Sequence, residues 1–205
     1  MPEKQDLPVR VSPLLPTQGD FIVDFKNVRL HERKALTAIQ VLTFKGKHQQ
    51  VATAIGRALG IDCSTEPGVS NSDGHTQISW NGPNSWMIVA SDNETGRASG
   101  ELLEMLQNAV GDSAAVVDQS HGRCGLRLSG PRARQVMAKN TSIDLHPRAF
   151  GPGRCALASV AHMNASIVQV DETPTYDLFV IRSLARSFAH AIEQACHEFE
   201  FENES

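Results

Sequence analysis

The stretch over residues 118–156 constrains the fold most, because it joins a strand pattern, a helix start and a stiff loop. Along 122–128, apolar side chains alternate with small or charged ones, the two-residue period of a β-strand. Ser-Gly-Pro at 129–131 is expected to stop this strand and cap a helix over 131–139, whose apolar residues recur at helical spacing. A long connection containing several proline and glycine residues then follows the helix. This succession predicts a strand, a helix and an ordered loop.

Ahead of that stretch, between residues 31 and 118, the expected order is β-α-β-β-α-β. Strands are predicted from apolar and β-branched runs at residues 35–44, 76–80, 86–90 and 114–117. Helices are predicted from apolar spacing at residues 51–59, closed by Gly60, and at 102–110. Residues 62–74 are expected to form a loop. The order is that of a ferredoxin-like split βαβ unit.

A second series, β-α-β-β-β-α, fills residues 119–205. Its later strands are predicted at 154–161, 165–170 and 175–181, and its last helix is expected to follow a Ser183 cap. We therefore predict an α+β fold of two ferredoxin-like βαββαβ-type modules, 31–118 and 119–205, packed as one compact unit.

Residues 1–30 are predicted to form an extended N-terminal arm, because they hold four prolines and little periodicity. The apolar residues within it are too many for a fully solvated tail: Phe21, Ile22, Val23 and Phe25. We expect them to anchor the arm against this domain or against another chain.

Composition limits the classes of partner that this chain is expected to bind. A formal net charge of −4, with no basic run carrying interleaved aromatics, argues against nucleic acid. No apolar run approaches the roughly 20 residues that span a bilayer, and the first residues lack the apolar segment of a signal peptide, so we expect no membrane partner and a cytoplasmic location. The four cysteines are far apart and are interpreted as free, buried thiols.

Patterns for catalysis or metal binding are weak. His121, His146 and His162 could be metal ligands, but they lack the spacing of zinc sites. The glycine-rich segments match no nucleotide fingerprint. Ser120 and His121 with Asp118 are too close in sequence on one strand to form a hydrolytic triad, and GxSxG is absent. Metal, catalytic and nucleotide sites are therefore not predicted in this chain.

Arginine gathers in the second half, which suggests docking. The candidate partner-interface residues are His121 just before the strand, Arg123 at its start, and His146, Arg148 and Phe150 on the connection. Arginine and aromatic side chains are enriched at interfaces, and the proline-stiffened loop would lose little entropy on docking. In the alternative interpretation the aromatic ring folds inward and closes the module's own core.

Several motifs resemble the gamma subunit of heterotetrameric sarcosine oxidase. The resemblance runs from about residue 35 to about residue 200 and rests on Trp80–Trp86, Asp118–Arg123, Leu126–Arg134, Ile143–Phe150, Gly153–Ala156 and Pro174–Ser183. It implies a fold like the folate-binding domain of the glycine-cleavage aminomethyltransferases, in agreement with the two modules.

The resemblance implies that this chain functions as one subunit of an enzyme complex. Complexes of this type oxidatively demethylate sarcosine or a related N-methyl amino acid, and combine this chain with alpha, beta and delta subunits. FAD, FMN, NAD, tetrahydrofolate and zinc are expected on those other subunits, with no cofactor bound by this chain alone. The family supplies no catalytic residue to carry over.

Two function hypotheses follow. The first is an accessory, non-catalytic subunit of a flavin-dependent amine oxidase or dehydrogenase. The second is a stand-alone folate-binding aminomethyltransferase-like enzyme, which needs an acidic residue to hold the pterin, and Asp118 is the candidate. Fold alone does not decide between them.

Overall fold

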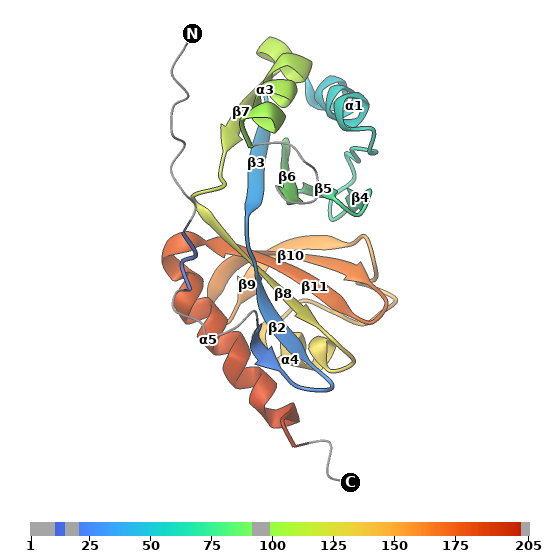
Figure 1. The fold of residues 1–205 in the computed structure, drawn as a ribbon. Helices are drawn as coiled ribbons and strands as arrows, with labels where there is room; N and C mark the ends of the chain where they lie inside the picture. The colour runs from blue at the N-terminus through green and yellow to red at the C-terminus, as the bar shows by residue number, and fades with distance from the viewer. Residues whose placement is uncertain (1–10, 15–20, 92–98, 202–205) are drawn as a thin grey trace.

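The computed structural model describes residues 11–14, 21–91 and 99–201, which form two antiparallel sheets with four α-helices (Figure 1). The five-stranded sheet has the order β4 (Ser70–Ser72), β5 (Thr76–Trp80), β6 (Ser85–Ser91), β3 (Leu36–Thr43) and β7 (Ala114–Asp118). The six-stranded sheet has the order β1 (Phe21–Asp24), β2 (Arg29–Arg33), β8 (Arg123–Ser129), β11 (Thr175–Ile181), β10 (Met163–Asp171) and β9 (Cys155–Val160). The helices are α1 (His48–Leu59), α3 (Ser99–Val110), α4 (Ala133–Asn140) and α5 (Ala185–Cys196), with short 3-10 turns at Gly111–Ser113, Arg182–Leu184 and His197–Phe199.

The five-stranded half has the predicted ferredoxin-like arrangement. Four strands lie in the order β5-β6-β3-β7, with α1 following β3 and α3 preceding β7. Gly60 ends α1 in the left-handed conformation, with φ 71°, and its N–H donates to the Gly56 carbonyl. The expected loop over 62–74 is partly wrong, because its end forms β4, which pairs with β5.

The six-stranded half differs from prediction at its edge. Residues 21–33, mostly assigned to an arm, form β1 and β2, and β2 pairs antiparallel with β8. Burial explains this pairing, since Val23, Val28 and Leu30 lie in the core against that sheet. The expected anchoring of this segment therefore occurs within this domain. Because β1 and β2 belong to the same sheet as β8, the sheet topology does not follow the predicted boundary at residue 31.

The two sheets lie face to face between outer helices, which gives four layers (Figure 1). Helices α1 and α3 cover the five-stranded sheet, while α4 and α5 cover the six-stranded sheet. A smaller apolar contact joins the inner faces, and its buried members are Ala38, Met87, Val89, Cys155, Val168 and Phe179. None of the helices in the described residues is long and apolar enough to cross a membrane.

Glycines permit two close approaches in this packing. A Cβ on Gly125 would lie 2.6 Å from Leu36 Cδ1 and 3.2 Å from the Phe179 ring, so a larger residue there would force these side chains to shift. Gly130 has φ +112°, and a Cβ would lie 2.6 Å from the Asn27 carbonyl oxygen.

The predicted Ser129 cap is wrong, since Ser129 ends β8 and α4 begins after Arg132 without a side-chain cap.

Candidate functional site

A group of charged side chains lies on the inner face of the six-stranded sheet because of the two-residue period of its strands. Leu126 on β8 and Leu178 on β11 face the helices and are fully buried. Their neighbours Arg127 and Asp177, which are direct cross-strand partners, therefore face the other sheet. Arg33, the last residue of β2, joins them there. The three side chains come from three adjacent strands.

Asp177 is the centre of this group, with only 1% of its side chain exposed. Its Oδ1 accepts from Arg127 Nε at 2.7 Å, and its Oδ2 accepts from Arg127 Nη2 at 2.9 Å. Arg33 Nη1 donates to the same Oδ2 at 2.7 Å. The contact to Arg127 is a bidentate fork, the strongest form of carboxylate pairing in proteins. Two guanidinium groups therefore compensate one buried carboxylate.

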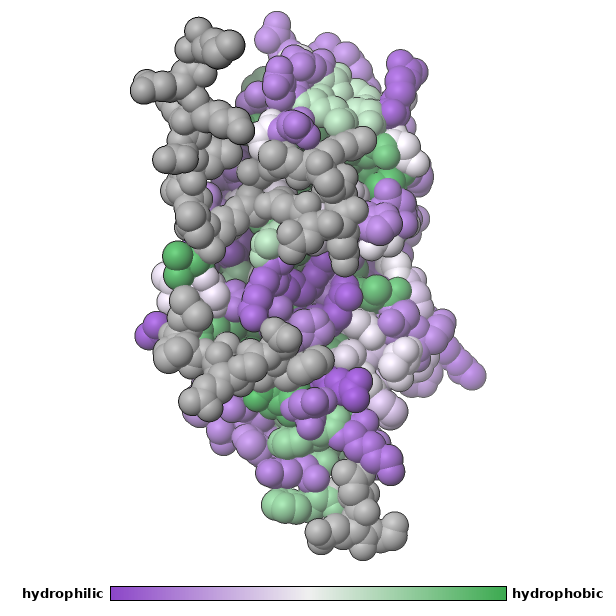
Figure 2. Space-filling model, viewed as in Figure 1, coloured by the Kyte–Doolittle hydropathy of each residue, from purple (hydrophilic) through white to green (hydrophobic). Residues whose placement is uncertain are grey.

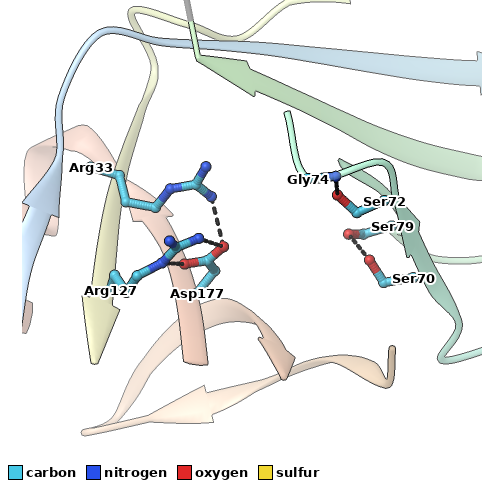
Figure 3. A network of polar contacts seen from close by, with 7 residues as sticks. All are labelled: Arg33, Ser70, Ser72, Gly74, Ser79, Arg127 and Asp177. Atoms are coloured by element: carbon cyan, nitrogen blue, oxygen red, sulfur yellow. Dashed lines mark hydrogen bonds and ion pairs between the residues drawn. The ribbon is translucent and has the colours of Figure 1, made fainter. Parts of the chain in front are cut away.

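The opposite wall comes from the five-stranded sheet (Figure 3). The hydroxyls of Ser70 and Ser79 contact each other at 2.9 Å across β4 and β5, and Ser72 Oγ accepts from the Gly74 N–H at 3.0 Å. Between this wall and the arginine cluster lies a cavity of about 430 Å³. Such a volume is within the range of roughly 300–1,000 Å³ that is common for ligand pockets. The site thus spans both halves of the chain.

Two glutamines in the cavity wall carry unpaired acceptors. Gln169 is fully buried, and its Nε2 donates to the Asp171 carbonyl, which leaves Oε1 without a described hydrogen-bond donor. Gln77 is 8% exposed, and its side-chain oxygen Oε1 likewise accepts no hydrogen bond from the described residues. Unsatisfied buried acceptors cost free energy, so this wall is polar beyond what packing requires.

The arrangement of these side chains suits ligand binding or a structural role better than acid–base catalysis. Three charged hydrogen bonds engage both oxygens of Asp177, so this carboxylate is already occupied by its two arginine partners. The Ser70 hydroxyl contacts the Ser79 hydroxyl, and among the described residues no basic side chain hydrogen-bonds to it to activate it as a nucleophile. No group of three or more potential metal ligands gathers in the described part of the chain.

The candidate folate residue lies outside this cavity. Asp118 ends β7, is exposed, and its Oδ1 accepts from the Ser120 N–H at 2.8 Å. This contact is a local turn, in which the carboxylate satisfies a backbone donor two residues ahead. The structure therefore gives Asp118 a structural role at the strand end.

The candidate interface residues separate into two places. His121 is exposed and Arg123 half-buried at the start of β8, where the sheets meet. His146 and Arg148 are exposed on the loop after α4. Phe150 was expected to anchor a partner, but it is 5% exposed and packs in the core of the six-stranded half. The inward alternative is therefore correct for Phe150, because burying its ring removes a large apolar surface from water.

The central pairing was missed at the sequence level. Arg33 and Asp177 are 144 residues apart, and Arg127 and Asp177 are 50 apart, so no local pattern joins them. One signal was available. A single aspartate within the apolar strand Thr175–Ile181 requires a buried cationic partner, because an isolated buried carboxylate is costly.

The fold is that of the folate-binding domain of the aminomethyltransferases, as the family resemblance implied. The chain resembles the crystal structure of glycine cleavage system aminomethyltransferase T from Bartonella henselae, with a TM-score of 0.60 and 16% identity over 82% of this chain and 46% of that chain. At this identity the likeness establishes the fold alone.

The chain belongs to the sarcosine oxidase gamma subunit family, whose model matches residues 46–198. It is 28% identical to the sarcosine oxidase subunit gamma of Corynebacterium sp. (strain U-96) over 84% of this chain and 80% of the relative. It is 31% identical to the subunit gamma of Arthrobacter sp. over 74% and 71%. It also resembles a chain of the heterotetrameric sarcosine oxidase from Corynebacterium sp. U-96 in complex with pyrrole 2-carboxylate, with a TM-score of 0.79 and 25% identity over 96% of this chain and 99% of that chain.

Proposed function

We propose that this chain is the accessory, non-catalytic gamma-type subunit of a heterotetrameric, flavin-dependent oxidase or dehydrogenase. The complex would oxidatively demethylate sarcosine or a related N-methyl amino acid. One observation carries the proposal: the likeness to a chain of the heterotetrameric oxidase spans nearly the full length of both chains. A fold shared over the full length of both chains supports a shared place in a complex of this kind.

The partners in this proposal are alpha, beta and delta subunits. FAD, FMN, NAD, tetrahydrofolate and zinc would be carried by those subunits, and none by this chain. We also propose a cytoplasmic complex, because the four cysteines are free and buried, as is usual for a chain in a reducing compartment.

The site chemistry supports the accessory role. Asp177 is held by two arginines that reach it from different strands, and the cavity beside it is bordered by both sheets. The three paired side chains all lie on the six-stranded sheet, so the pairing holds adjacent strands of that sheet together and gives the described site a structural role.

The docking surface is proposed to include the exposed loop after α4. His146 and Arg148 are exposed there. Arg134 on α4 holds the loop in place by donating a hydrogen bond to the Leu145 carbonyl. Phe150 inserts into the core and fixes the loop ends. His121 at the start of β8 remains a second contact candidate.

Co-expression tests the assembly. The full chain, tagged and expressed with candidate alpha, beta and delta subunits, is expected to co-purify with them as a complex that oxidises sarcosine or a related N-methyl amino acid. Arg148→Ala should weaken that co-purification, and Arg57→Ala, an exposed arginine on α1, is the matched control. Failure of the wild-type chain to co-purify with flavoproteins would refute the subunit assignment.

Calorimetry with tetrahydrofolate tests the enzyme alternative. We expect no micromolar binding to the chain alone, and no change in Asp118→Ala, because this carboxylate already caps a turn. Micromolar binding that is lost in Asp118→Ala would instead favour a folate-dependent enzyme.

A further inference from the structure

A second cavity, of about 230 Å³, lies where the chain crosses between the two sheets. Its walls come from residues 11–13, from 32–38 at the crossing into β3, and from 120–125 at the start of β8. Phe179 and Arg182 complete the lining. This cavity is separate from the polar cavity beside Asp177, although Arg33 borders both.

Arg123 is the unusual member of this wall. It is half-buried and also borders a void of about 10 Å³ between the sheets, together with Ala38 and Val89. Its guanidinium makes no hydrogen bond or ion pair with any described residue, unlike Arg33 and Arg127 nearby. Burial lowers the pKa of Arg123 below its ordinary value, since desolvation disfavours the charged form. A partly desolvated cation without a counter-charge among the described residues is costly, so an anion bound beside it would offset that cost.

The rest of the lining is cationic as well. Arg33, Lys34 and Arg182 contribute to the wall, and Glu32 is the one carboxylate among the lining residues, where it accepts from the Ser12 hydroxyl. This excess of positive charge is local, because the whole chain has a formal net charge of −4. Figure 2 shows hydrophilic side chains gathered across the middle of the molecule, between its two halves. A cleft lined by one sign of charge concentrates ions of the other sign.

Between these charges the walls are apolar. Leu36 and Phe179 close against Gly125, and Pro13 and Cys124 add further apolar surface. The volume is below the roughly 300–1,000 Å³ of pockets for drug-sized ligands, so the occupant is small. An apolar wall also favours a carboxylate with an apolar body over a phosphate, whose several oxygens would each need a donor.

The N-terminal segment narrows the choice between a free ligand and a partner chain. Residues 11–14 border the cavity and are fastened to the six-stranded half: Arg182 Nη2 donates to the Val11 carbonyl at 2.6 Å, and Arg186 Nε to the Pro13 carbonyl at 3.1 Å. Leu14 is buried in the core and holds the segment's end. A cavity bordered by the chain's own segment in this way suits a small molecule better than a protruding protein side chain.

We propose that this cavity binds a small organic carboxylate with an apolar body, whose carboxylate pairs with Arg123. The planar guanidinium matches a carboxylate in bidentate geometry. The apolar body lies against Leu36 and Phe179. Binding is non-covalent and involves no chemical step, so the site is a ligand-binding site of the subunit itself.

The test uses the full chain and 4-fluorobenzoate as the probe, followed by fluorine NMR. Wild type should bind it saturably, and the uncharged 4-fluorobenzamide should bind far more weakly. Arg123→Gln should weaken binding of the carboxylate by about tenfold to a hundredfold, the scale of a lost charged hydrogen bond. Arg57→Gln is the control and should leave binding unchanged. Arg123→Met should not lower the melting temperature of the empty chain, because the charge it removes is unpaired.

A second measurement needs no variant. In wild type, the side-chain N–H resonance of Arg123 should shift on addition of 4-fluorobenzoate and stay in place with the amide. Equal binding of acid and amide, or equal binding by wild type and Arg123→Gln, would overturn the proposal. Loss of co-purification with partner subunits in Arg123→Gln, with probe binding unchanged, would also overturn it and assign the guanidinium to a partner's carboxylate.

Discussion

Replacing Asp177 with alanine tests how much the buried pairing on the inner face of the six-stranded sheet stabilises the fold. The change removes the acceptor for three hydrogen bonds of 2.7–2.9 Å and leaves two guanidinium groups without their shared carboxylate. The side chains of Arg33 and Arg127 are 14% and 33% exposed, so neither regains full hydration. We therefore expect a loss of stability.

The size of the loss follows from burial. Breaking a buried ion pair by removing one partner costs about 3–5 kcal/mol, because the remaining charge is uncompensated. Arg127 lies at one-third exposure, where water recovers part of that cost, so the expectation is about 3 kcal/mol. With a typical urea dependence, this corresponds to a midpoint lowered by about 1–2 M.

Urea unfolding, followed by tryptophan fluorescence, measures this loss. Trp86 is 1% exposed in the core of the five-stranded half and reports on its packing. Asp24→Ala is the matched control, because its ion pair with Arg29 has a similar distance of 2.9 Å but both side chains are 57% exposed. The control should cost at most about 1 kcal/mol. An equally small cost for Asp177→Ala would refute the reasoning that burial makes this pairing matter.

Three further predictions follow from burial and backbone geometry. Phe150→Ala should cost about 3–5 kcal/mol in thermal or urea unfolding, whereas Arg148→Ala should leave the isolated chain's stability almost unchanged; equal effects would contradict the core assignment. Gly130→Ala should destabilise the chain by more than about 1 kcal/mol, because alanine is strained at φ +112° and its Cβ would meet a carbonyl; an unchanged melting temperature would count against this. Burial raises the pKa of Cys196 from 9.0 to about 12, with Glu193 adding to the shift, so this thiol should resist labelling at pH 8 until urea unfolds the chain. Because the folded thiol keeps a proton that the unfolded one releases, stability should fall as the pH rises above 9 and should be insensitive to this group below it; rapid native labelling would show the thiol to be accessible.

Local elements of this fold could be predicted because their signals are short-range. Residues 51–59 carry apolar side chains on one helical face and end at a glycine, and α1 has this form. β5 matches its predicted bounds, and β11 does as well, since runs of β-branched and aromatic residues favour strands over any local alternative. Capping was less predictable: Ser129 is a good cap by type, but pairing with β2 and β11 extends β8 through it.

The outcome for Phe150 shows a limit of composition. An aromatic next to an arginine on a stiff loop is typical of an interface and equally typical of a loop that closes its own core. Only the position of α4 and the six-stranded sheet decided between them, because burial depends on which surfaces lie opposite.

The sequence by itself determined the α+β class, most strands and helices, and the motifs of the gamma subunit family. Periodicity even determined that Arg123, Gly125 and Arg127 share one face of a strand. Tertiary structure alone decided what that face meets. The pairing of β2 with β8 brings Arg33 to Asp177 across 144 residues, and the contact of the two sheets leaves Arg123 half-buried without a described partner. Such pairings depend on long-range strand order, which is set by the burial of whole faces and leaves no trace in local spacing.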